Sequence, residues 1–186
     1  SCRRFVYADD ICMAHQAITF AELECTLTAD LARITEYCSR WRLKPSVTKT
    51  VSSVFHLHNA SASRELEVTM NGQRLRHDPF PCYLGVTFDR ALTYKEHLTK
   101  TAKKLASRNN LLMKLAGSTW GASASTLRTS ALALCFSVAE YCCPVWFQSA
   151  HTHLVDVKLN TTLRLITGTL HPTPLPWLPV LASQVK

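Results

Sequence analysis

The 186-residue sequence has no unbroken apolar run of about 18 residues, the length that a membrane-spanning helix requires. Its longest apolar stretch, residues 131–147, is interrupted by Ser137, Glu140 and Pro144. The first residues lack the apolar segment of a secretory signal peptide, and the chain shows no internal repeat. We therefore expect no transmembrane helix and no signal peptide.

Paired cysteines and acidic residues are also scarce. None of the eight cysteines forms a C-x-x-C pair, so we expect an intracellular, reduced protein without a disulfide scaffold. Only 13 Asp and Glu residues oppose 21 Lys and Arg residues, which gives a net charge of +8 and a pI near 9.2. This excess favours a polyanionic partner, of which nucleic acid is the commonest in cells; a basic surface kept for solubility is the alternative. A hydrophobic content of 47% excludes extensive disorder.

The chain begins with the pattern of a β-hairpin followed by a long helix. Apolar residues flank Asp9 and Asp10 within residues 5–14, which predicts a tight hairpin with both carboxylates at its tip. A capping box then opens at Thr19, and apolar residues recur at three- and four-residue steps. We predict an amphipathic helix over residues 19–41.

Three further strands are expected before residue 90. Alternating apolar and polar residues predict strands over 51–57, 66–70 and 82–89. Asn71-Gly72 is a strong signal for a two-residue hairpin turn. Gly85, at the centre of the last strand, indicates either a close approach of another backbone or a bulge. We expect the first hairpin to share an antiparallel sheet with this last strand, and the long helix to cover one face of that sheet.

The second half of the chain follows a helical period. After Asp89 the spacing of apolar residues changes from two to about 3.6. Helices are predicted over about 93–116, 124–141 and 151–167, and the Pro-rich stretch 172–179 is expected to be irregular. The pattern therefore predicts an α+β fold in which a mixed half precedes an all-helical half.

The sequence Tyr7-Ala8-Asp9-Asp10 is the strongest chemical signal in the chain. Burial and mutual repulsion would make two adjacent acids in an apolar hairpin unfavourable unless a cation lies on them. Carboxylate oxygens suit Mg²⁺, which takes one or two protein carboxylates and keeps water or substrate phosphates as its other ligands. In a two-metal site such ligands serve in-line phosphoryl transfer. A merely solvated Asp-Asp turn is the alternative.

Several motifs, taken in order, resemble the reverse transcriptase of non-LTR retrotransposons of the jockey, long-interspersed-element type. Residues 7–10 resemble the palm motif that carries two of three metal-binding carboxylates. Residues 41–50, W-R-L-K-P-S-V-T-K-T, resemble the next palm motif, with Ser46 where many members have Asn. Residues 83–89 resemble the primer grip. Later segments resemble the thumb helices of this group, namely residues 115–121, 139–146 and 163–168.

The resemblance implies a partial polymerase palm over residues 1–90, with an antiparallel sheet and a packed helix, an all-helical thumb over 91–170 and a Pro-rich tail over 171–186. It implies an RNA-directed DNA polymerase that adds deoxynucleoside triphosphates to a DNA primer along an RNA template, by two-metal chemistry with Mg²⁺, in the nucleus. The implied catalytic residues are Asp9, Asp10 and Lys49, with both Asp residues as metal ligands; the implied primer contacts are Tyr83, Leu84, Gly85 and Val86.

Other parts of the family are expected upstream of Ser1 in a parent polyprotein, including the fingers and the first metal-binding Asp. Asp30, Asp78, Asp89 and Asp156 lie in no matching strand, and we interpret them as surface or capping acids. The chain alone is therefore expected to be inactive.

Two alternatives stay open at this point. One is a non-catalytic, nucleic-acid-binding remnant of a decayed element. The other is a reverse transcriptase of the group II intron type, which shares the Tyr-Ala-Asp-Asp sequence. Trp120-Gly121 and residues 164–168 favour the retrotransposon type.

Basic residues dominate the helix predicted over 93–116, whose one nearby acid is Glu96. Such a face either binds phosphates or is only solvated, and the thumb resemblance favours nucleic-acid binding. The residues expected to contact nucleic acid are Lys100, Lys103, Lys104 and Arg108.

Histidine and cysteine pairs give little indication of zinc. His56-x-His58, and Cys142-Cys143 with His151-x-His153, match none of the usual spacings of structural zinc sites. We expect His56 and His58 to lie on one strand face and the cysteines to pack as small apolar residues.

Overall fold

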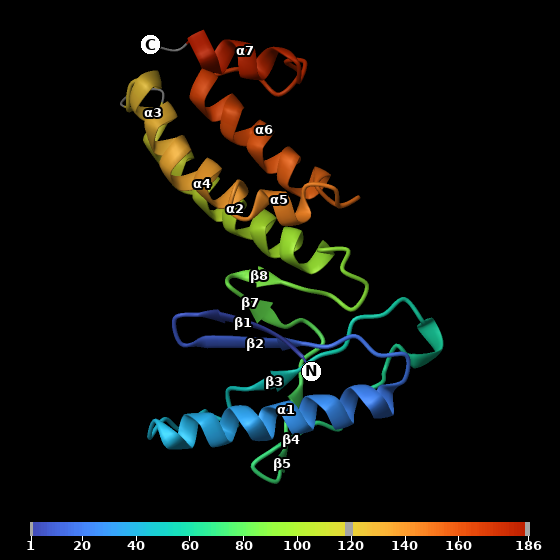
Figure 1. Ribbon diagram of the computed structural model, residues 1–186. Helices are drawn as coiled ribbons and strands as arrows, with labels where there is room; N and C mark the ends of the chain where they lie inside the picture. Colours follow the sequence, from blue (N-terminus) through green and yellow to red (C-terminus); the bar gives the residue numbers. More distant parts are fainter. Residues whose placement is uncertain (1, 118–120, 185–186) are drawn as a thin grey trace. The chain divides into compact units, whose positions relative to one another are not determined.

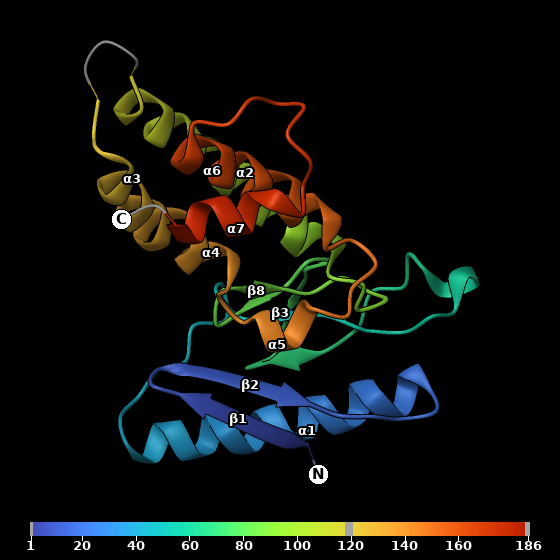
Figure 2. The ribbon, with the colours of Figure 1, turned by 90° about the horizontal axis from the view of Figure 1, so that it is seen from above.

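The computed structural model in Figures 1 and 2 describes residues 2–117 and 121–184. The chain folds as two compact units, Ser1–Leu92 and Thr93–Lys186. The first unit combines short strands with one long helix, and the described part of the second is helical. This content agrees with the predicted α+β class. The assignment of the units as palm and thumb stays a prediction.

The first unit opens with the expected hairpin. Strands β1 (Arg3–Tyr7) and β2 (Asp10–Ala14) pair antiparallel over five register pairs. The turn between them consists of Ala8 and Asp9 alone. The predicted hairpin with an acidic tip is therefore confirmed.

Helix α1 (Phe20–Arg40) is the predicted long helix and begins at the capping box. Thr19 is its N-cap, and Thr19 Oγ1 accepts a hydrogen bond from the Glu22 amide at 3.3 Å. The apolar stripe of the helix packs on a small core because its residues recur at helical spacing. That core contains Leu66, Val68, Met70 and Leu75, with Phe20, Leu23, Leu27, Leu31, Val47 and Val54 packed against it.

The remaining strands of this unit are two residues long and form separate ladders. Strand β3 pairs in parallel with β6, while β4 pairs with β5 and β7 with β8 antiparallel. Among the described residues the β1–β2 hairpin shares no ladder with β8, so the predicted common sheet is wrong. The bounds are β3 (Val51–Ser52), β4 (Thr69–Met70), β5 (Gln73–Arg74), β6 (Arg76–His77), β7 (Cys82–Tyr83) and β8 (Val86–Thr87), with one 3₁₀ turn at Asn59–Ser61.

Tight two-residue turns connect two of these strand pairs. Asn71-Gly72 connects β4 and β5, as predicted, and Leu84-Gly85 connects β7 and β8. All four residues have positive φ, which is the backbone conformation of type I′ hairpin turns. Gly85, with a φ of 78°, therefore lies in a turn and not in a bulge at the centre of a strand.

The strand predicted over 51–57 ends after two residues. The guanidinium of Arg90 donates to the carbonyl oxygens of His56 and His58, at 3.1 and 3.3 Å. The His56 amide donates to the Arg90 carbonyl oxygen at 3.0 Å. These contacts satisfy backbone groups that a strand would have paired in a ladder, so His56 and His58 do not share a strand face.

The second unit is built on two long helices. Helices α2 (Lys95–Leu115) and α6 (His153–Thr167) confirm the helices predicted over 93–116 and 151–167. Leu98, Leu105 and Leu112 of α2 are almost fully buried in their core. The shorter helices are α3 (Ala124–Ala131), α4 (Ser137–Ala139), α5 (Cys143–Trp146) and α7 (Trp177–Gln184).

The helix predicted over 124–141 is continuous but changes pitch. Helix α3 runs into a π-helical turn, Leu132–Phe136, which leads directly into α4. Such turns occur often at functional positions. Residues 118–120, which include Trp120 of a predicted thumb segment, lie outside the described residues.

The Pro-rich end of the chain is not irregular throughout. Helix α7 packs against α6, with Leu178 and Ala182 buried at 0% and 7% exposure. Pro179 falls in its first turn, where a missing N–H costs no helical hydrogen bond. The expectation of an irregular segment over 172–179 is therefore wrong from Trp177 onward.

A buried polar cluster joins α2 to α6. Asn109 is 5% exposed; its Nδ2 donates to the Lys158 carbonyl oxygen at 2.9 Å, and its Oδ1 accepts from Thr162 Oγ1 at 2.7 Å.

Asn109→Ala is expected to lower the free energy of unfolding by about 1–3 kcal/mol, because buried groups lose a partner. The exposed neighbour gives a matched control: Asn110→Ala should change it by less than about 0.5 kcal/mol. Urea unfolding followed by helical circular dichroism measures both, and equal losses would contradict the expectation.

Candidate metal site and nucleic-acid interface

The turn of the first hairpin presents both carboxylates to solvent. Ala8 has a φ of 53°, a left-handed conformation that alanine rarely adopts. Asp9 follows it in the turn, and Asp10 opens β2. Both side chains are exposed, and within the described residues neither carboxylate forms a hydrogen bond or an ion pair. The pair is available to an external cation.

The expectation that burial destabilises this pair of acids is wrong. The tip of the hairpin is open, since even Val6 and Tyr7 beside it are 66% exposed. Mutual repulsion of the two adjacent carboxylates is the remaining unfavourable effect. Two carboxylates surrounded by solvent suit Mg²⁺, which keeps several waters and needs only one or two protein carboxylates. Among the described residues no group of three His, Cys, Asp or Glu side chains converges, so water or substrate oxygens would complete the shell.

Lys49, the third residue expected in catalysis, lies in a tight turn. The Thr50 amide and hydroxyl both donate to the Ser46 carbonyl oxygen, at 3.1 and 2.8 Å, and Lys49 is exposed beside them. Figures 1 and 2 both show the β1–β2 turn and the C-terminal end of α1, from which this segment continues, at the same end of the first unit. Within the described residues no hydrogen bond or ion pair joins Lys49 to Asp9 or Asp10.

The expected primer contacts form the tip of the β7–β8 hairpin. Leu84 and Gly85 make the exposed turn, and Tyr83 is half-buried beside them. Val86 is only 4% exposed, so its side chain is part of the packing and presents no contact surface. The accessible part of this segment is therefore residues 83–85.

One acid interpreted as a surface or capping residue is instead buried. Asp30 on α1 is 1% exposed and accepts hydrogen bonds from the Cys2 amide at 2.6 Å and from Arg33 Nη1 at 2.9 Å. These interactions, the Cys2 amide first, hold the pKa of Asp30 at about 2. The other three acids agree with the interpretation: Asp78 and Asp89 accept backbone amides two residues on, and Asp156 is exposed in the first turn of α6.

The basic face of α2 is confirmed as exposed at three lysines. Lys100, Lys103 and Lys104 point away from the buried stripe of the helix. Lys100 lies 4.0 Å from Glu96, a surface pair of little energetic weight. Burial lowers the pKa of His97, and the charges of Lys104 and Lys100 lower it further.

Arg108 does not belong to this basic face. Its Nη1 donates a hydrogen bond to the Leu134 carbonyl oxygen, which lies within the π-helical turn. A π turn displaces backbone carbonyls from their usual partners, so a guanidinium is a suitable donor there. Its head group is engaged with another helix of the unit, and the expectation that Arg108 contacts nucleic acid stays a prediction.

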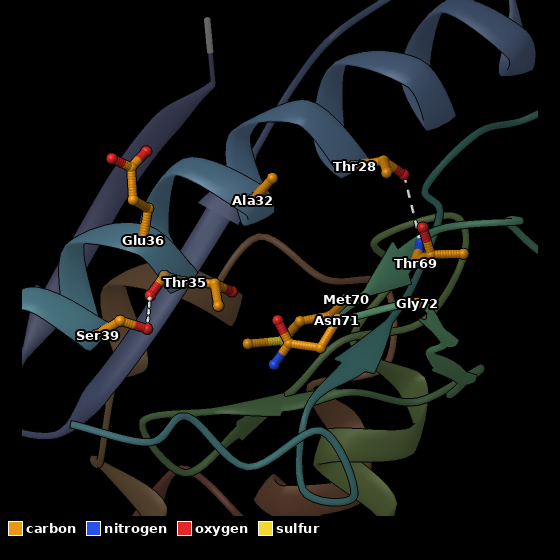
Figure 3. A pocket seen from close by; sticks show the side chains of 9 residues that line it. All are labelled: Thr28, Ala32, Thr35, Glu36, Ser39, Thr69, Met70, Asn71 and Gly72. Carbon is orange, nitrogen blue, oxygen red and sulfur yellow. Dashed lines mark hydrogen bonds between the residues drawn. The ribbon is translucent and has the colours of Figure 1, made fainter. Parts of the chain in front are cut away.

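Two further features of the described surface are a pair of histidines and a groove. His151 and His153 have ring centroids 6.3 Å apart, and no metal cluster is formed by them or by any other described residues. A groove of about 460 Å³ lies between α1 and the β4–β5 turn and is edged by Thr28, Thr35 and Met70 (Figure 3). None of the predicted site residues borders it.

No helix among the described residues has the length and apolarity needed to cross a bilayer.

Comparison with known proteins gives consistent matches. The chain is 28% identical over 166 residues, 87% of its length, to the "Probable RNA-directed DNA polymerase from transposon BS" of Drosophila melanogaster. It is 26% identical over 83% of its length to the "Retrovirus-related Pol polyprotein from type-1 retrotransposable element R1 4" of Nasonia vitripennis. Over 55% of its length it is 30% identical to the "RNA-directed DNA polymerase from mobile element jockey" of Drosophila funebris.

The chain spans 18%, 43% and 11% of the lengths of these three relatives. No family model and no solved structure matches it. The matches agree with the motif resemblance over most of the chain and with the retrotransposon type in preference to the group II intron type. By sequence, the chain is similar to the RNA-directed DNA polymerases of jockey-like and R1 non-LTR retrotransposons.

Proposed function

We propose that this chain is the palm-and-thumb portion of a non-LTR retrotransposon reverse transcriptase, working within a larger polyprotein. The observation that carries the proposal is the exposed, unpaired Asp9-Asp10 pair at a hairpin turn, in a chain related to RNA-directed DNA polymerases. Its substrates would be deoxynucleoside triphosphates, a DNA primer and an RNA template, and its place of action the nucleus.

Asp9 and Asp10 would act together as the metal-binding carboxylates of the palm. Bound Mg²⁺ would activate the primer 3′-hydroxyl and stabilise the leaving pyrophosphate. A third carboxylate is required by the motif, and the described residues bring none to this turn. Lys49, exposed on a segment that continues from the same end of α1, would face the phosphates of the incoming nucleotide.

The turn of β7 and β8 would contact the primer backbone. Its two central residues, Leu84 and Gly85, are exposed, and glycine lets another backbone approach closely. In the second unit, Lys100, Lys103 and Lys104 would follow the phosphates of the template–primer duplex, since phosphate contacts need only exposed positive charge.

A non-catalytic remnant that only binds nucleic acid is the second candidate function. It is favoured by the same exposed lysines on α2, which need no metal to act. The two candidates differ at Asp9 and Asp10, whose carboxylates matter for polymerisation and not for binding.

A combined binding and extension assay tests the proposal. The chain is expected to bind a labelled RNA template annealed to a DNA primer, and to leave the primer unextended with Mg²⁺ and all four nucleotides, because two carboxylates alone cannot hold the full metal site. Asp9→Asn should bind equally well. Absence of binding would contradict the proposal. Extension that Asp9→Asn abolishes would show instead that this chain contains a complete catalytic site.

A further inference from the structure

The hairpin that carries Asp9 and Asp10 is attached to its unit by few interactions. All five β1 side chains are exposed, and on β2 Cys12 and Met13 are half-buried while the other three are exposed, so packing holds the hairpin only weakly. In the part of the chain that the structure describes, its two strands pair only with each other. Among the described residues, every hydrogen bond or ion pair that leaves residues 2–14 ends on one carboxylate, that of Asp30.

The carboxylate of Asp30 uses both oxygens in this attachment. Oδ2 accepts the Cys2 amide at 2.6 Å, a short, charge-assisted hydrogen bond. Oδ1 accepts Arg33 Nη1 at 2.9 Å and lies 3.8 Å from Arg4 Nη2. One buried side chain of α1 is thus bound to the backbone at the base of β1 and to a β1 side chain.

The paired strands β1 and β2 connect this attachment at Cys2 to the turn at the other end of the hairpin. β1 begins one residue after Cys2, and the five register pairs make the two strands move as one body. At about 3.3 Å per residue the turn lies roughly 20 Å from Cys2. A tilt of about 5° at the base would therefore shift the carboxylates of Asp9 and Asp10 by roughly 2 Å, more than the ~1 Å that catalytic geometry tolerates.

We propose that Asp30 is a positioning residue for the Asp9-Asp10 site, clamping the base of the hairpin to α1 so that its tip keeps a fixed place in the first unit. The proposal rests on the proposed function in one respect, that the tip needs a fixed place because it holds a metal ion. Asp30 itself lies at the opposite end of the hairpin and touches neither metal nor substrate.

Amide hydrogen exchange of the metal-free chain tests the clamp. In Asp30→Asn the amides of residues 3–14 are expected to exchange at least about tenfold faster, because the charged acceptor is lost. Amides of α1 near Leu27 and Leu31 should change by less than about twofold. The control, Glu36→Gln, removes an exposed acid from the same helix and should leave both regions unchanged.

A pH profile separates the clamp from general stability. The pKa of Asp30 is lowered to about 2 by the Cys2 amide first and the Cys2 thiol second, with Arg33 and Arg4 also facing it. A lowered pKa means that the stabilisation is complete above the ordinary value near 4 and is lost as the pH falls through about 2. In the wild type, the protection of residues 3–14 against exchange should therefore decrease as the pH falls through about 2. In Asp30→Asn this decrease should be absent.

Each outcome decides the proposal. Unchanged exchange of the hairpin amides in Asp30→Asn would overturn it. An equal loss of protection in the hairpin and across α1 would also overturn it, because Asp30 would then only stabilise the unit as a whole. If Asp30→Asn does not fold, the double variant Arg4→Met/Arg33→Met replaces it. In that variant, exchange is expected to be about threefold faster and only in the hairpin. Unchanged exchange in the hairpin would overturn the proposal. Because no metal is present, a failure of metal binding at Asp9-Asp10 would leave these results untouched.

Discussion

Replacing Lys100, Lys103 and Lys104 together by alanine is expected to flatten the dependence of log affinity for duplex DNA on log salt concentration by about two to three units. Each phosphate that a lysine neutralises releases condensed counterions, which contributes about 0.9 to that slope for B-form DNA. All three lysines are exposed on one side of α2. The loss of affinity should be similar for unrelated sequences, because phosphate contacts carry no base information.

A charge-matched control is available in the first unit. Arg40, Arg74 and Arg76 are exposed, and Arg40 and Arg74 already lie beside glutamates. Replacing these three by alanine removes the same formal charge and should leave the slope within about half a unit. Fluorescence anisotropy at several salt concentrations measures both variants. Equal slopes for the two triple variants would show that the basic face of α2 is only solvated.

Arg108 is left out of the first variant for a structural reason. Spacing alone places it on the same face as Lys100 and Lys104, four residues apart each time. Its guanidinium instead binds the carbonyl oxygen of Leu134, 26 residues away. Helical periodicity predicts which residues share a face, but it cannot predict that a π turn in another helix will capture one of them.

Local rules predicted the local elements well. A capping box at Thr19 and an Asn-Gly pair at residues 71–72 each act through neighbouring backbone groups, and both are found where expected. The Leu84-Gly85 turn escaped prediction because leucine seldom adopts a positive φ. Helix α7 escaped prediction because a Pro-rich stretch such as 172–179 indicates an irregular segment, although the first turn of a helix tolerates proline.

Long-range burial was the part that the sequence could not reveal. Asp9 and Asp10 were recognised from their own neighbours in the chain, but the importance of Asp30 depends on Cys2, which is 28 residues away. An acid in an amphipathic helix is usually solvated, so its sequence context favoured a surface position. Arg33, three residues after Asp30 on the same helix, is a weak signal in the sequence that this acid is paired.

Substitution of both Asp9 and Asp10 by asparagine is expected to abolish divalent-metal binding at the hairpin turn. The two carboxylates are exposed and adjacent and, within the described residues, form no internal ion pair, so a cation would reduce their mutual repulsion. Removing both charges removes the oxygen donors that Mg²⁺ and Mn²⁺ prefer. With two protein ligands the affinity should lie in the millimolar range, so the loss appears as a complete absence of saturable binding.

Paramagnetic broadening of amide resonances by Mn²⁺ tests this most directly. In the wild-type chain, broadening should be centred on residues 8–11 and should be reversed by excess Mg²⁺. It should persist in Asp156→Asn, which removes an exposed acid from α6, and disappear in Asp9→Asn/Asp10→Asn. Broadening that is centred elsewhere, or that survives in the double variant, would contradict the assignment of Asp9 and Asp10 as metal ligands.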